Sequence, residues 1–536
     1  MYRKLFYLLL AVALVLPLAA CGPQDGADDG DHGPTDVLRV GLGGRPETLD
    51  PHVAASRAVV LLYNMYEPLV DLDRDTTNIV GELAEDWDVS ADGLTYTFYL
   101  RRGVKFHDGT DFTGEDVKAS FDRIRGLKTG AYWALNFLKD VTVKDDFTVE
   151  MTIEAGGPPF IQAVALIPIV SADAIEANKT TDDEWAKTWF YDHVAGTGPY
   201  TLESWSQADR VVMTKFDDYW QGWDGKHFSK AIFFVIPEAS QQVLQLEGGD
   251  LDITERFDPE SLDNMRANED ITVIEEESGV RVLYIRINSD PNSGATGNVL
   301  VRKAINYAFD FEGFHQAMSD TIIPTNEPVP NQWLKDTSIP IEAEYDLDKA
   351  RQYLAEAGYE PGELTLNLSY LARYPEQQLA AEMLQAGLKE IGVTLELRPS
   401  EWGPMVDQMV AWGDDRQPDT ALHMFLLWTP PRIPDAYAYL WYMYHTDAQG
   451  GLGRNLMYYG DPEVDSLIDQ GSLSDDPDER LDYYIEATRK VASDYPDVVL
   501  GLQRQIYVHR SDIGGFYVYP TWYPVTVVYP LYRITD

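Results

Sequence analysis

Short stretches of alternating hydrophobic and polar residues predict β-strands along much of the chain. Residues 37–42 alternate and then break at glycines, which indicates a strand that enters a loop. Residues 87–100 and 140–154 each have the pattern of a hairpin, with Asp92-Gly93 and Asp145-Asp146 at the turns. Residues 281–288 form another alternating run and predict a further strand.

Helical periodicity occurs between these strands, at about 57–66, from Gly114 onward, and near 299–308, 347–357 and 376–391. Thr113 precedes the second of these segments and is its expected N-cap. Strands and helices therefore mix throughout, without an internal repeat or a long linker. This order predicts an α/β architecture whose lobes are built from discontinuous segments.

The first twenty residues have the features of a secretory signal. Arg3 and Lys4 precede an apolar run from about Leu5 to Leu18, which is too short to span a bilayer comfortably. The run ends in Leu18-Ala19-Ala20-Cys21, which resembles the lipobox of bacterial lipoproteins. We therefore expect residues 1–20 to be a signal peptide and Cys21 to be lipidated.

Residues 21–36 contain Gly, Pro and Asp but no large apolar side chain, so we expect an acidic tether that does not fold. Cys21 is the only cysteine, which excludes a disulfide framework and a Cys-ligated zinc site. The net charge of −46 disfavours nucleic acid as a partner. The whole chain is 45% hydrophobic, and the body that follows the tether is long enough for two or more cores. No second apolar run approaches the length needed to span a membrane.

Several motifs occur in an order that resembles one protein family. They are "NMYEPLVDLD" (64–73), "LAEDWDVSADGLTYTFYLRRGVKFHDGTDFTGEDV" (83–117), "GTGPYTLESW" (196–205), "YIRINSDP" (284–291), "VRKAINYAFD" (301–310) and "YDLDKARQYLAEAGY" (345–359). Together they resemble the solute-binding proteins of peptide/nickel-type ABC importers, which are extracellular solute-binding proteins of family 5. The resemblance runs from about Val37 to the C-terminus.

This resemblance implies a periplasmic-binding-protein-like fold of type II, with two lobes, a hinge and an extra inserted subdomain. Carried onto this chain, the first lobe comprises residues 37–82, 195–288 and 500–536. The inserted subdomain comprises residues 83–194, and the second lobe comprises residues 289–499. Within the "FHDG" turn we expect His107 to be a structural hydrogen-bonding residue rather than a catalytic one.

The candidate binding region lies in "LLWTPPRIPDAYAYLWYMYHT" (426–446). In peptide-binding members of the resembled family, this region is similar to Trp-x-Ala-Asp-Tyr-Pro-Asp-Pro, whose first Asp pairs with the α-amino group of the ligand. Here Trp428 is followed by Thr-Pro-Pro and then Arg432, so the carboxylate is absent from its expected position. Asp435 could take that role after a shift, although an Asp at this place more often caps the following helix, 436–444.

Two arginines and several aromatic residues complete the candidate site. Arg45 would face the cleft if the resemblance holds, and together with Arg432 it favours an anionic or hydroxylated ligand. Tyr132 and Trp133 could offer flat platforms to sugar rings, although most aromatic residues are expected to be core. Tyr437, Trp441 and Tyr444 recur at helical spacing and predict a stripe that packs inward. The ligand-binding candidates are Trp428, Arg432, Asp435, Arg45, Tyr132, Trp133 and Tyr437.

The sequence thus predicts a lipid-anchored, non-enzymatic and periplasmic or cell-surface receptor that delivers an oligosaccharide, a glycoside or an oligopeptide to an ABC permease. Loss of the amine-pairing Asp favours the carbohydrate. We expect no cofactor, no metal and no nucleic acid, and the resemblance implies a monomer. A secreted glycoside hydrolase that uses two carboxyl groups is the alternative, because such a reaction needs only a suitably spaced pair.

Overall fold

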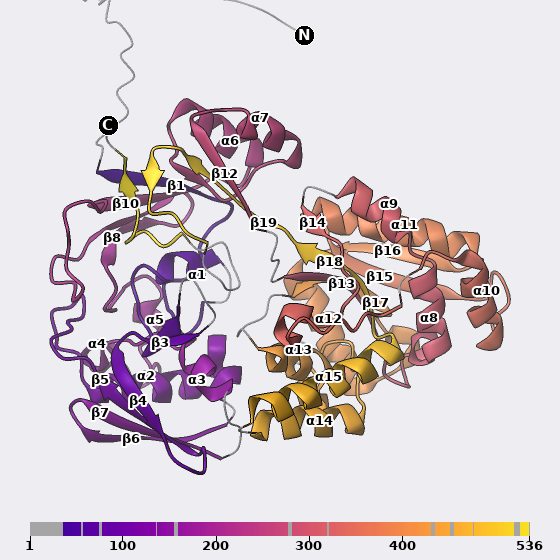
Figure 1. The fold of residues 1–536 in the computed structure, drawn as a ribbon, viewed down its shortest axis with the longest axis horizontal. Coiled ribbons are helices and arrows are strands. Elements are labelled where there is room, and N and C mark those ends of the chain that lie inside the picture. Colours follow the sequence, from indigo (N-terminus) through magenta and orange to yellow (C-terminus); the bar gives the residue numbers. More distant parts are fainter. Residues whose placement is uncertain are drawn as a thin grey trace, which may run out of the picture. The chain divides into compact units, whose positions relative to one another are not determined.

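The strands of the computed structural model form three main sheets, of seven, six and four strands (Figure 1). The structure describes residues 36–54, 57–73, 78–135, 137–154, 159–276, 281–318, 321–342, 344–429, 435–450, 455–474, 476–518 and 526–534. The predicted signal peptide, Cys21 and nearly all of the tether lie outside these ranges.

A seven-stranded sheet contains the first strand of the chain. Its order is β12 (Ile271–Glu276), β19 (Gln505–Arg510), β11 (Ile253–Thr254), β1 (Val37–Leu42), β10 (Lys230–Val235), β9 (Arg210–Lys215) and β8 (Tyr200–Ser206). Strand β1 pairs in parallel with β10 and β11, so it is central in the sheet. Leu38, Val40 and Leu42 are fully buried, as their alternation predicts. The helices of this part are α1 (Arg57–Leu62), α6 (Ala239–Gly248) and α7 (Leu262–Arg266).

A six-stranded sheet is formed mainly by the second half of the chain. Its order is β14 (Ile322–Ile323), β18 (Asp497–Gln503), β13 (Val282–Ile287), β17 (Met424–Thr429), β15 (Thr365–Leu371) and β16 (Thr394–Ser400). All six residues of β13 are buried. Leu283, Ile285 and Ile287 pack into one core while Val282 and Tyr284 pack into another, so helices cover both faces of the sheet.

The helices of this second sheet separate into groups by the core to which they contribute. Helices α8 (Val299–Tyr307), α9 (Phe311–Ala317), α10 (Leu347–Glu356) and α11 (Pro375–Glu390) contribute to the first core. Helices α13 (Ala436–Tyr444), α14 (Pro462–Leu473) and α15 (Pro477–Asp494) contribute to the second. Helix α12 (Trp402–Asp415) packs with Phe425 and Leu427 of β17.

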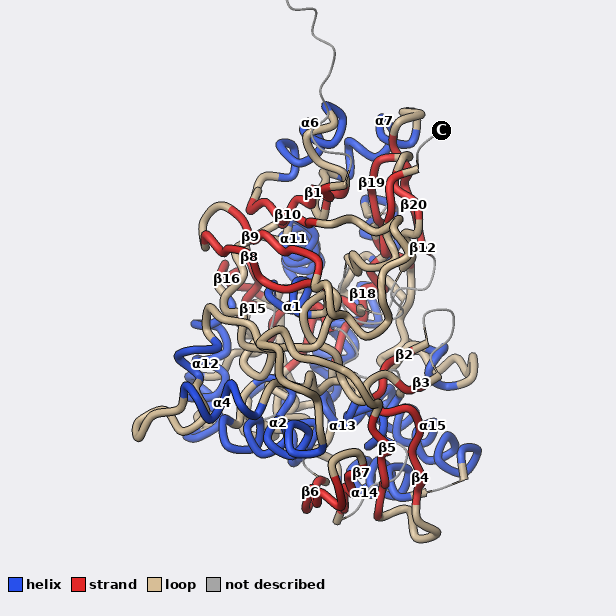
Figure 2. The backbone as a smooth tube through the Cα atoms, turned by 90° about the vertical axis from the view of Figure 1, so that its left-hand side faces the viewer, coloured by secondary structure: helices blue, strands red, loops and turns tan. Residues whose placement is uncertain are grey.

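A four-stranded antiparallel sheet, seen in Figure 2, is formed by residues of the predicted inserted subdomain. Its order is β4 (Ala84–Val89), β5 (Thr95–Leu100), β7 (Thr148–Ile153) and β6 (Leu138–Asp145), and both predicted hairpins are confirmed. Helix α2 (Gly114–Leu127) begins after Thr113, whose backbone N–H donates to Asp116 Oδ2 at 2.8 Å, so the predicted N-cap is also confirmed. Short helices α3 (Pro159–Val164), α4 (Ala172–Asn178) and α5 (Lys187–Phe190) follow.

The chain passes between the two large sheets twice. It leaves β12 for β13, and it returns from β18 to β19 through the single residue Arg504, whose N–H donates to Thr321 O at 2.8 Å. The sequence placed the borders of the lobes after residue 288 and before residue 500. In the structure, β13 and all of β18 pair in the six-stranded sheet. The alternation of residues predicts that a segment is a strand, but it does not identify the strands with which it pairs.

Two small ribbons complete the described strands. Strand β2 (Val70–Leu72) pairs with β3 (Ile79–Gly81) just before the four-stranded sheet begins. Strand β20 (Ile513–Gly514) pairs with β21 (Tyr532–Arg533) near the end of the chain.

Candidate functional site

The carboxyl ends of β15 and β17 lie at one edge of the six-stranded sheet, where β17 carries the predicted site residue Trp428. These two strands are parallel neighbours, and β17 ends at Thr429 while α11 begins shortly after β15. Ligands of open α/β sheets bind outside the carboxyl ends of parallel strands. This edge is therefore the candidate site. Arg432 follows directly but lies outside the described residues, so its role stays a prediction.

Trp428 is held at this edge by the protein itself. Only 7% of the residue is exposed, and its indole Nε1 donates to Glu376 Oε1 of α11 at 2.8 Å. The guanidinium carbon of Arg281 lies 5.6 Å from the centre of the indole ring, within range of a cation–π contact. Glu376 and Arg281 thus fix the orientation of the ring. Contact between Trp428 and a ligand stays a prediction.

Asp435 is the N-cap of α13. Its Oδ1 accepts from Tyr437 N at 2.8 Å, and its Oδ2 lies 3.2 Å from Arg480 Nη2 of α15. Burial raises the pKa of this carboxyl group, and the adjacent Arg480 opposes the shift. Both carboxylate oxygens therefore have protein partners. The prediction that Asp435 caps the helix is confirmed, and the cap uses the carboxylate that a ligand amine would need.

Helix α13 is core rather than a binding surface along most of its length. Eight of its nine residues are buried, and Trp441 packs against the same core. The ring of Tyr437 lies 6.2 Å from that of Phe137, 6.4 Å from Trp441 and 6.5 Å from Tyr484. Burial raises the pKa of the Tyr437 phenol. The predicted inward stripe is confirmed, and nearly the whole circumference of the helix joins it.

The remaining candidates come from other parts of the fold. Arg45 is exposed in the loop after β1, and Tyr132 is half-buried in a 3-10 helix, Gly130–Leu135, where it packs against the core of the four-stranded sheet. The side chain of Trp133 lies outside the described part of the structure. Asp435 and Tyr437 thus share helix α13, which contributes to the second core, whereas Trp428 packs into the first core on the other face of the sheet. Arg45 and Tyr132 belong to the other two sheets.

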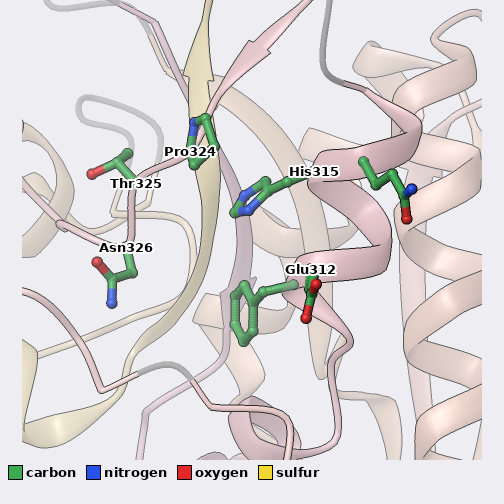
Figure 3. Close-up of a pocket in the computed structure, with 7 residues that line it drawn as sticks. Glu312, His315, Pro324, Thr325 and Asn326 are labelled. Carbon is green, nitrogen blue, oxygen red and sulfur yellow. The ribbon is translucent and has the colours of Figure 1, made fainter.

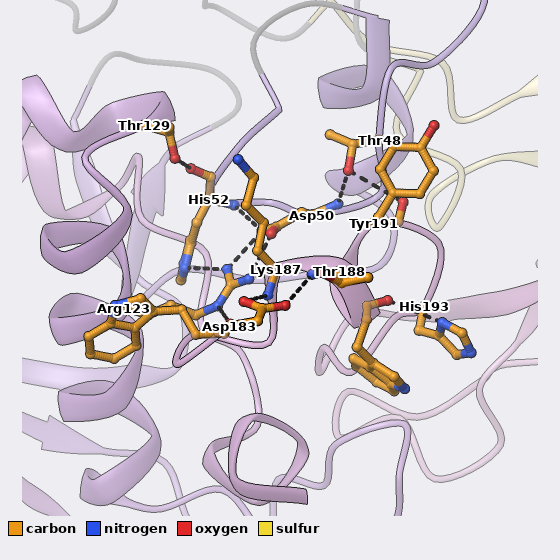
Figure 4. Close-up of polar contacts among 12 residues, drawn as sticks. Thr48, Asp50, His52, Arg123, Thr129, Asp183, Lys187, Thr188, Tyr191 and His193 are labelled. Carbon is orange, nitrogen blue, oxygen red and sulfur yellow. Dashed lines mark hydrogen bonds and ion pairs between the residues drawn. The ribbon is translucent and has the colours of Figure 1, made fainter. Parts of the chain in front are cut away.

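A buried polar cluster was missed by the sequence analysis (Figure 4). Arg123 of α2 donates from Nη1 and Nη2 to the two oxygens of Asp50 at 2.7 Å each, and from Nε to Trp185 O at 2.8 Å. His52 Nδ1 lies 3.1 Å from Arg123 Nη1, so it must accept, and Nε2–H donates to Pro168 O at 2.8 Å. The cluster joins the loop after β1 to the inserted subdomain.

The same cluster keeps His52 neutral. Burial disfavours the charged ring and the cation of Arg123 repels a second one, so the pKa of His52 falls to about 4. Arg123 itself lies on the buried face of α2 between Phe121 and Ile124, which could have signalled a buried ion pair. The partner Asp50 is remote in the sequence, and no local pattern identifies it.

A groove lies beside β14 (Figure 3). Its volume is about 680 Å³, which is within the range of small-molecule sites. His315 Nε2 donates to Leu500 O at 2.7 Å, so this ring is also fixed by the fold. None of the predicted site residues lines the groove. The lining residues are Phe311, Glu312, His315, Gln316, Pro324, Thr325 and Asn326.

Other chemistry can be assessed only over the ranges that the structure describes. There, no group of three or more His, Cys, Asp or Glu side chains could hold a metal ion, and no helix is long and apolar enough to cross a membrane. His107 Nε2 donates to Gly198 O at 2.8 Å, and burial lowers the pKa of its ring to about 4. The predicted structural role of His107 is confirmed.

Comparison with known proteins connects these features to one family. Residues 78–451 match the family model described as "Bacterial extracellular solute-binding proteins, family 5 Middle". The probable D,D-dipeptide-binding periplasmic protein DdpA of Escherichia coli (strain K12) is 28% identical over 499 residues, which cover 91% of this chain and 92% of that protein. The glutathione-binding protein GsiB of Pectobacterium atrosepticum is 26% identical over 486 residues, which cover 90% and 91%.

A solved structure extends the match to the fold. The periplasmic binding protein DppA of Helicobacter pylori, in complex with the peptide STSA, superposes with a TM-score of 0.81 at 24% identity. The superposition covers 93% of this chain and 98% of the other. The fold expected from the sequence is thereby confirmed over nearly the whole chain.

Proposed function

Because the chain belongs to family 5 of the bacterial extracellular solute-binding proteins, the solute receptors of ABC importers, we propose that its ligand is a short peptide or peptide conjugate. The observation that carries the proposal is the similarity, over about 90% of the chain, to a D,D-dipeptide-binding protein and a glutathione-binding protein. The protein captures its ligand outside the cytoplasm and presents it to a membrane permease without changing it chemically.

The construction of the two large sheets supports capture by closure. Between the strands that the structure describes, the chain crosses from one sheet to the other twice, once from β12 to β13 and once through Arg504. Hinge motions are absorbed by a few residues at such connections, and a ligand that contacts both lobes shifts the population toward the closed state. In this proposal the carboxyl end of β17 supplies one wall of the ligand site, with Trp428 as its main aromatic contact.

In this proposal Asp435 is not the partner of an α-amino group, because its two oxygens already contact Tyr437 N and Arg480. The ligand is therefore held mainly through its amide groups and its carboxylate, with Arg432 and Arg45 as the proposed cations. This also accommodates the D,D-dipeptides and the glutathione that the relatives' names indicate. An oligosaccharide, which the sequence favoured, is the competing ligand class.

Cys21 is the proposed site of the lipid anchor, which would tether the receptor to the membrane beside its permease. Intact-mass measurement of the mature protein tests this point. An added diacylglycerol and a Cys21→Ala variant that is released from membranes would support the anchor. A mature wild-type protein that lacks any lipid mass would contradict it.

Thermal unfolding of the soluble chain without the signal and tether tests the ligand class. The panel contains L- and D-dipeptides, glutathione, tetrapeptides and oligosaccharides, and only ligands that prefer the native state raise the midpoint. We expect a shift with one peptide group, and this shift should be smaller in Trp428→Phe than in the matched control Trp205→Phe. Among the described residues, the indole N–H of Trp205 has no hydrogen-bond partner that the substitution would remove. A shift with sugars alone would overturn the peptide assignment, and turnover of any glycoside would overturn the receptor assignment.

A further inference from the structure

Glu67 lies in the loop between α1 and β2 and is almost completely buried. Only 5% of the residue is exposed. Its Oε2 accepts from Thr197 Oγ1 at 2.7 Å, its Oε1 accepts from Tyr219 OH at 2.8 Å, and both oxygens lie 3.1 Å from Trp220 Nε1. Three donors thus converge on one carboxyl group. Hydrogen bonds of this kind favour its ionised form.

Glu82 brings a second carboxyl group to the same place. It follows β3, directly before the four-stranded sheet, and its side chain forms a hydrogen bond with that of Glu67. Gln221 Nε2 donates to Glu82 Oε1 at 3.1 Å, and the backbone N–H of Glu82 donates to Leu69 O at 3.0 Å. The contact therefore joins the root of the inserted subdomain to loops of the seven-stranded sheet.

A hydrogen bond between two carboxyl groups requires a proton on one of them, because two carboxylates have only acceptors. Burial is the largest cause that raises the pKa of each group, and for Glu82 the charges of Glu67 and Asp71 add to it. Arg101 opposes the shift of Glu82. Its Nε donates to the backbone O of Glu82 at 2.9 Å, and its guanidinium carbon lies 4.3 Å above the ring of Trp220.

The other titratable groups that face the pair are phenols. Tyr219 OH donates a hydrogen bond to Glu67, and Tyr529 interacts electrostatically with Glu67. Burial raises the pKa of both phenols, so both stay neutral when the carboxyl pair titrates. Since Glu67 receives the three donors, Glu82 is the group that keeps the proton.

We propose that Glu82 is protonated at neutral pH and shares its proton with Glu67, so that this pair forms an alkaline-sensitive joint between the segment that enters the four-stranded sheet and the loops of the seven-stranded sheet. Loss of the proton places a second negative charge, on the half-buried Glu82, in contact with the buried carboxylate of Glu67 and loosens the joint. The joint acts whichever solute the protein binds, so it stands independently of the proposed function.

The test compares Glu82→Gln with wild type, because glutamine keeps a donor at this position and cannot ionise. The matched control is Glu85→Gln, which removes an exposed carboxylate from the neighbouring β4. The unfolding constant is measured by chemical denaturation from about pH 5 to about pH 9. Because the folded protein keeps a proton that the unfolded chain loses, this constant should rise by up to about tenfold per pH unit. We expect Glu82→Gln to remove this rise and Glu85→Gln to keep it. Parallel profiles for all three proteins would overturn the proposal.

A second readout does not depend on whether the variant folds. The infrared spectrum of folded wild type at neutral pH should contain the carbonyl band of a protonated carboxylic acid, and this band should disappear reversibly on titration to alkaline pH. The far-ultraviolet circular dichroism is recorded alongside to show that the fold persists at neutral pH. Absence of the band at neutral pH would contradict the shared proton directly.

Discussion

Buried polar side chains occur both in the cluster of Asp50, His52 and Arg123 and at the edge of the sheet at 428–437. The two regions differ in whether these buried groups have hydrogen-bond partners. In the cluster, Nε, Nη1 and Nη2 of Arg123 all donate at 2.7–2.8 Å (Figure 4). At the edge, the buried Thr429 Oγ1 and Arg480 Nη1 have no hydrogen-bond partner within the described ranges. Buried polar groups that hold a fold are normally satisfied, so we assign the cluster to stability. Recognition at the edge is the proposal that the variants below test.

The largest effect is expected from breaking the cluster. Arg123→Met leaves the carboxylate of Asp50 buried without its cation, which should lower the free energy of unfolding by about 3–5 kcal/mol. Arg125→Met, on the same helix but only half-buried, should change it by less than about 0.5 kcal/mol. Urea unfolding of both variants measures the difference. A loss below about 1 kcal/mol for Arg123→Met would contradict the assignment.

The next effect is the response of the cluster to acid. His52 has a pKa of about 4 in the folded protein against an ordinary value of 6.5, so the unfolded chain takes up its proton first. The contribution of His52 is fully present above about pH 6.5 and is lost as the pH falls toward 4, by about 3 kcal/mol in total.

His52→Gln isolates this contribution from that of His107 and His423, whose pKa values also fall to about 4 on burial. Between pH 7 and 4, unfolding of His52→Gln should take up about one proton fewer than unfolding of wild type. The free energy of unfolding of the variant should therefore fall less as the pH is lowered. His193→Gln provides the control, because it removes an exposed histidine that lies outside the buried cluster. Equal acid sensitivity of wild type and His52→Gln would show that His52 is not held neutral.

A smaller effect on stability is expected at Asp435. Asp435→Asn keeps an N-cap but removes the charge opposite Arg480, which is partly solvated, so the loss should be about 1–2 kcal/mol. Because the carboxylate serves the cap and Arg480, the affinity for the ligand should fall by less than about tenfold, or about 1.4 kcal/mol. Calorimetric titration of the folded variant checks this. A loss of binding by several orders of magnitude would show that Asp435 contacts the ligand directly.

The smallest effect on stability is expected at Trp428. Trp428→Phe removes the hydrogen bond to Glu376, which should lower the free energy of unfolding by about 1 kcal/mol. If the edge is a recognition surface, ligand affinity should fall by more than this, while Trp205→Phe leaves the affinity unchanged. The two variants are compared by urea unfolding and by titration. An unchanged affinity in Trp428→Phe would remove Trp428 from the site.

Local elements were predictable from the sequence because their signals are local. The strand 37–42, the N-cap at Thr113 and the helix 436–444 all follow from neighbouring residues. The partner of β13 was not predictable, since its apolar run suits either sheet. The pairing of Arg123 with Asp50 spans 73 residues and depends on the packing of α2 against the loop after β1.

The candidate site was only partly predictable for the same reason. The sequence identified Asp435 as a helix cap, but Arg480, which occupies its second oxygen, belongs to another helix of the same core. Trp428 was singled out as a ligand contact, while its partners Glu376 and Arg281 come from segments that only the sheet brings together.

The central claim is that this receptor captures a short peptide, and a competition measured by native mass spectrometry tests it most directly. The soluble chain is equilibrated with an equimolar mixture of dipeptides, D,D-dipeptides, glutathione, tetrapeptides and oligosaccharides, and the mass added to the folded protein is recorded. We expect one added mass that belongs to a peptide, and we expect this peptide to be recovered unchanged after release. An added oligosaccharide, or a peptide recovered in cleaved form, would contradict it.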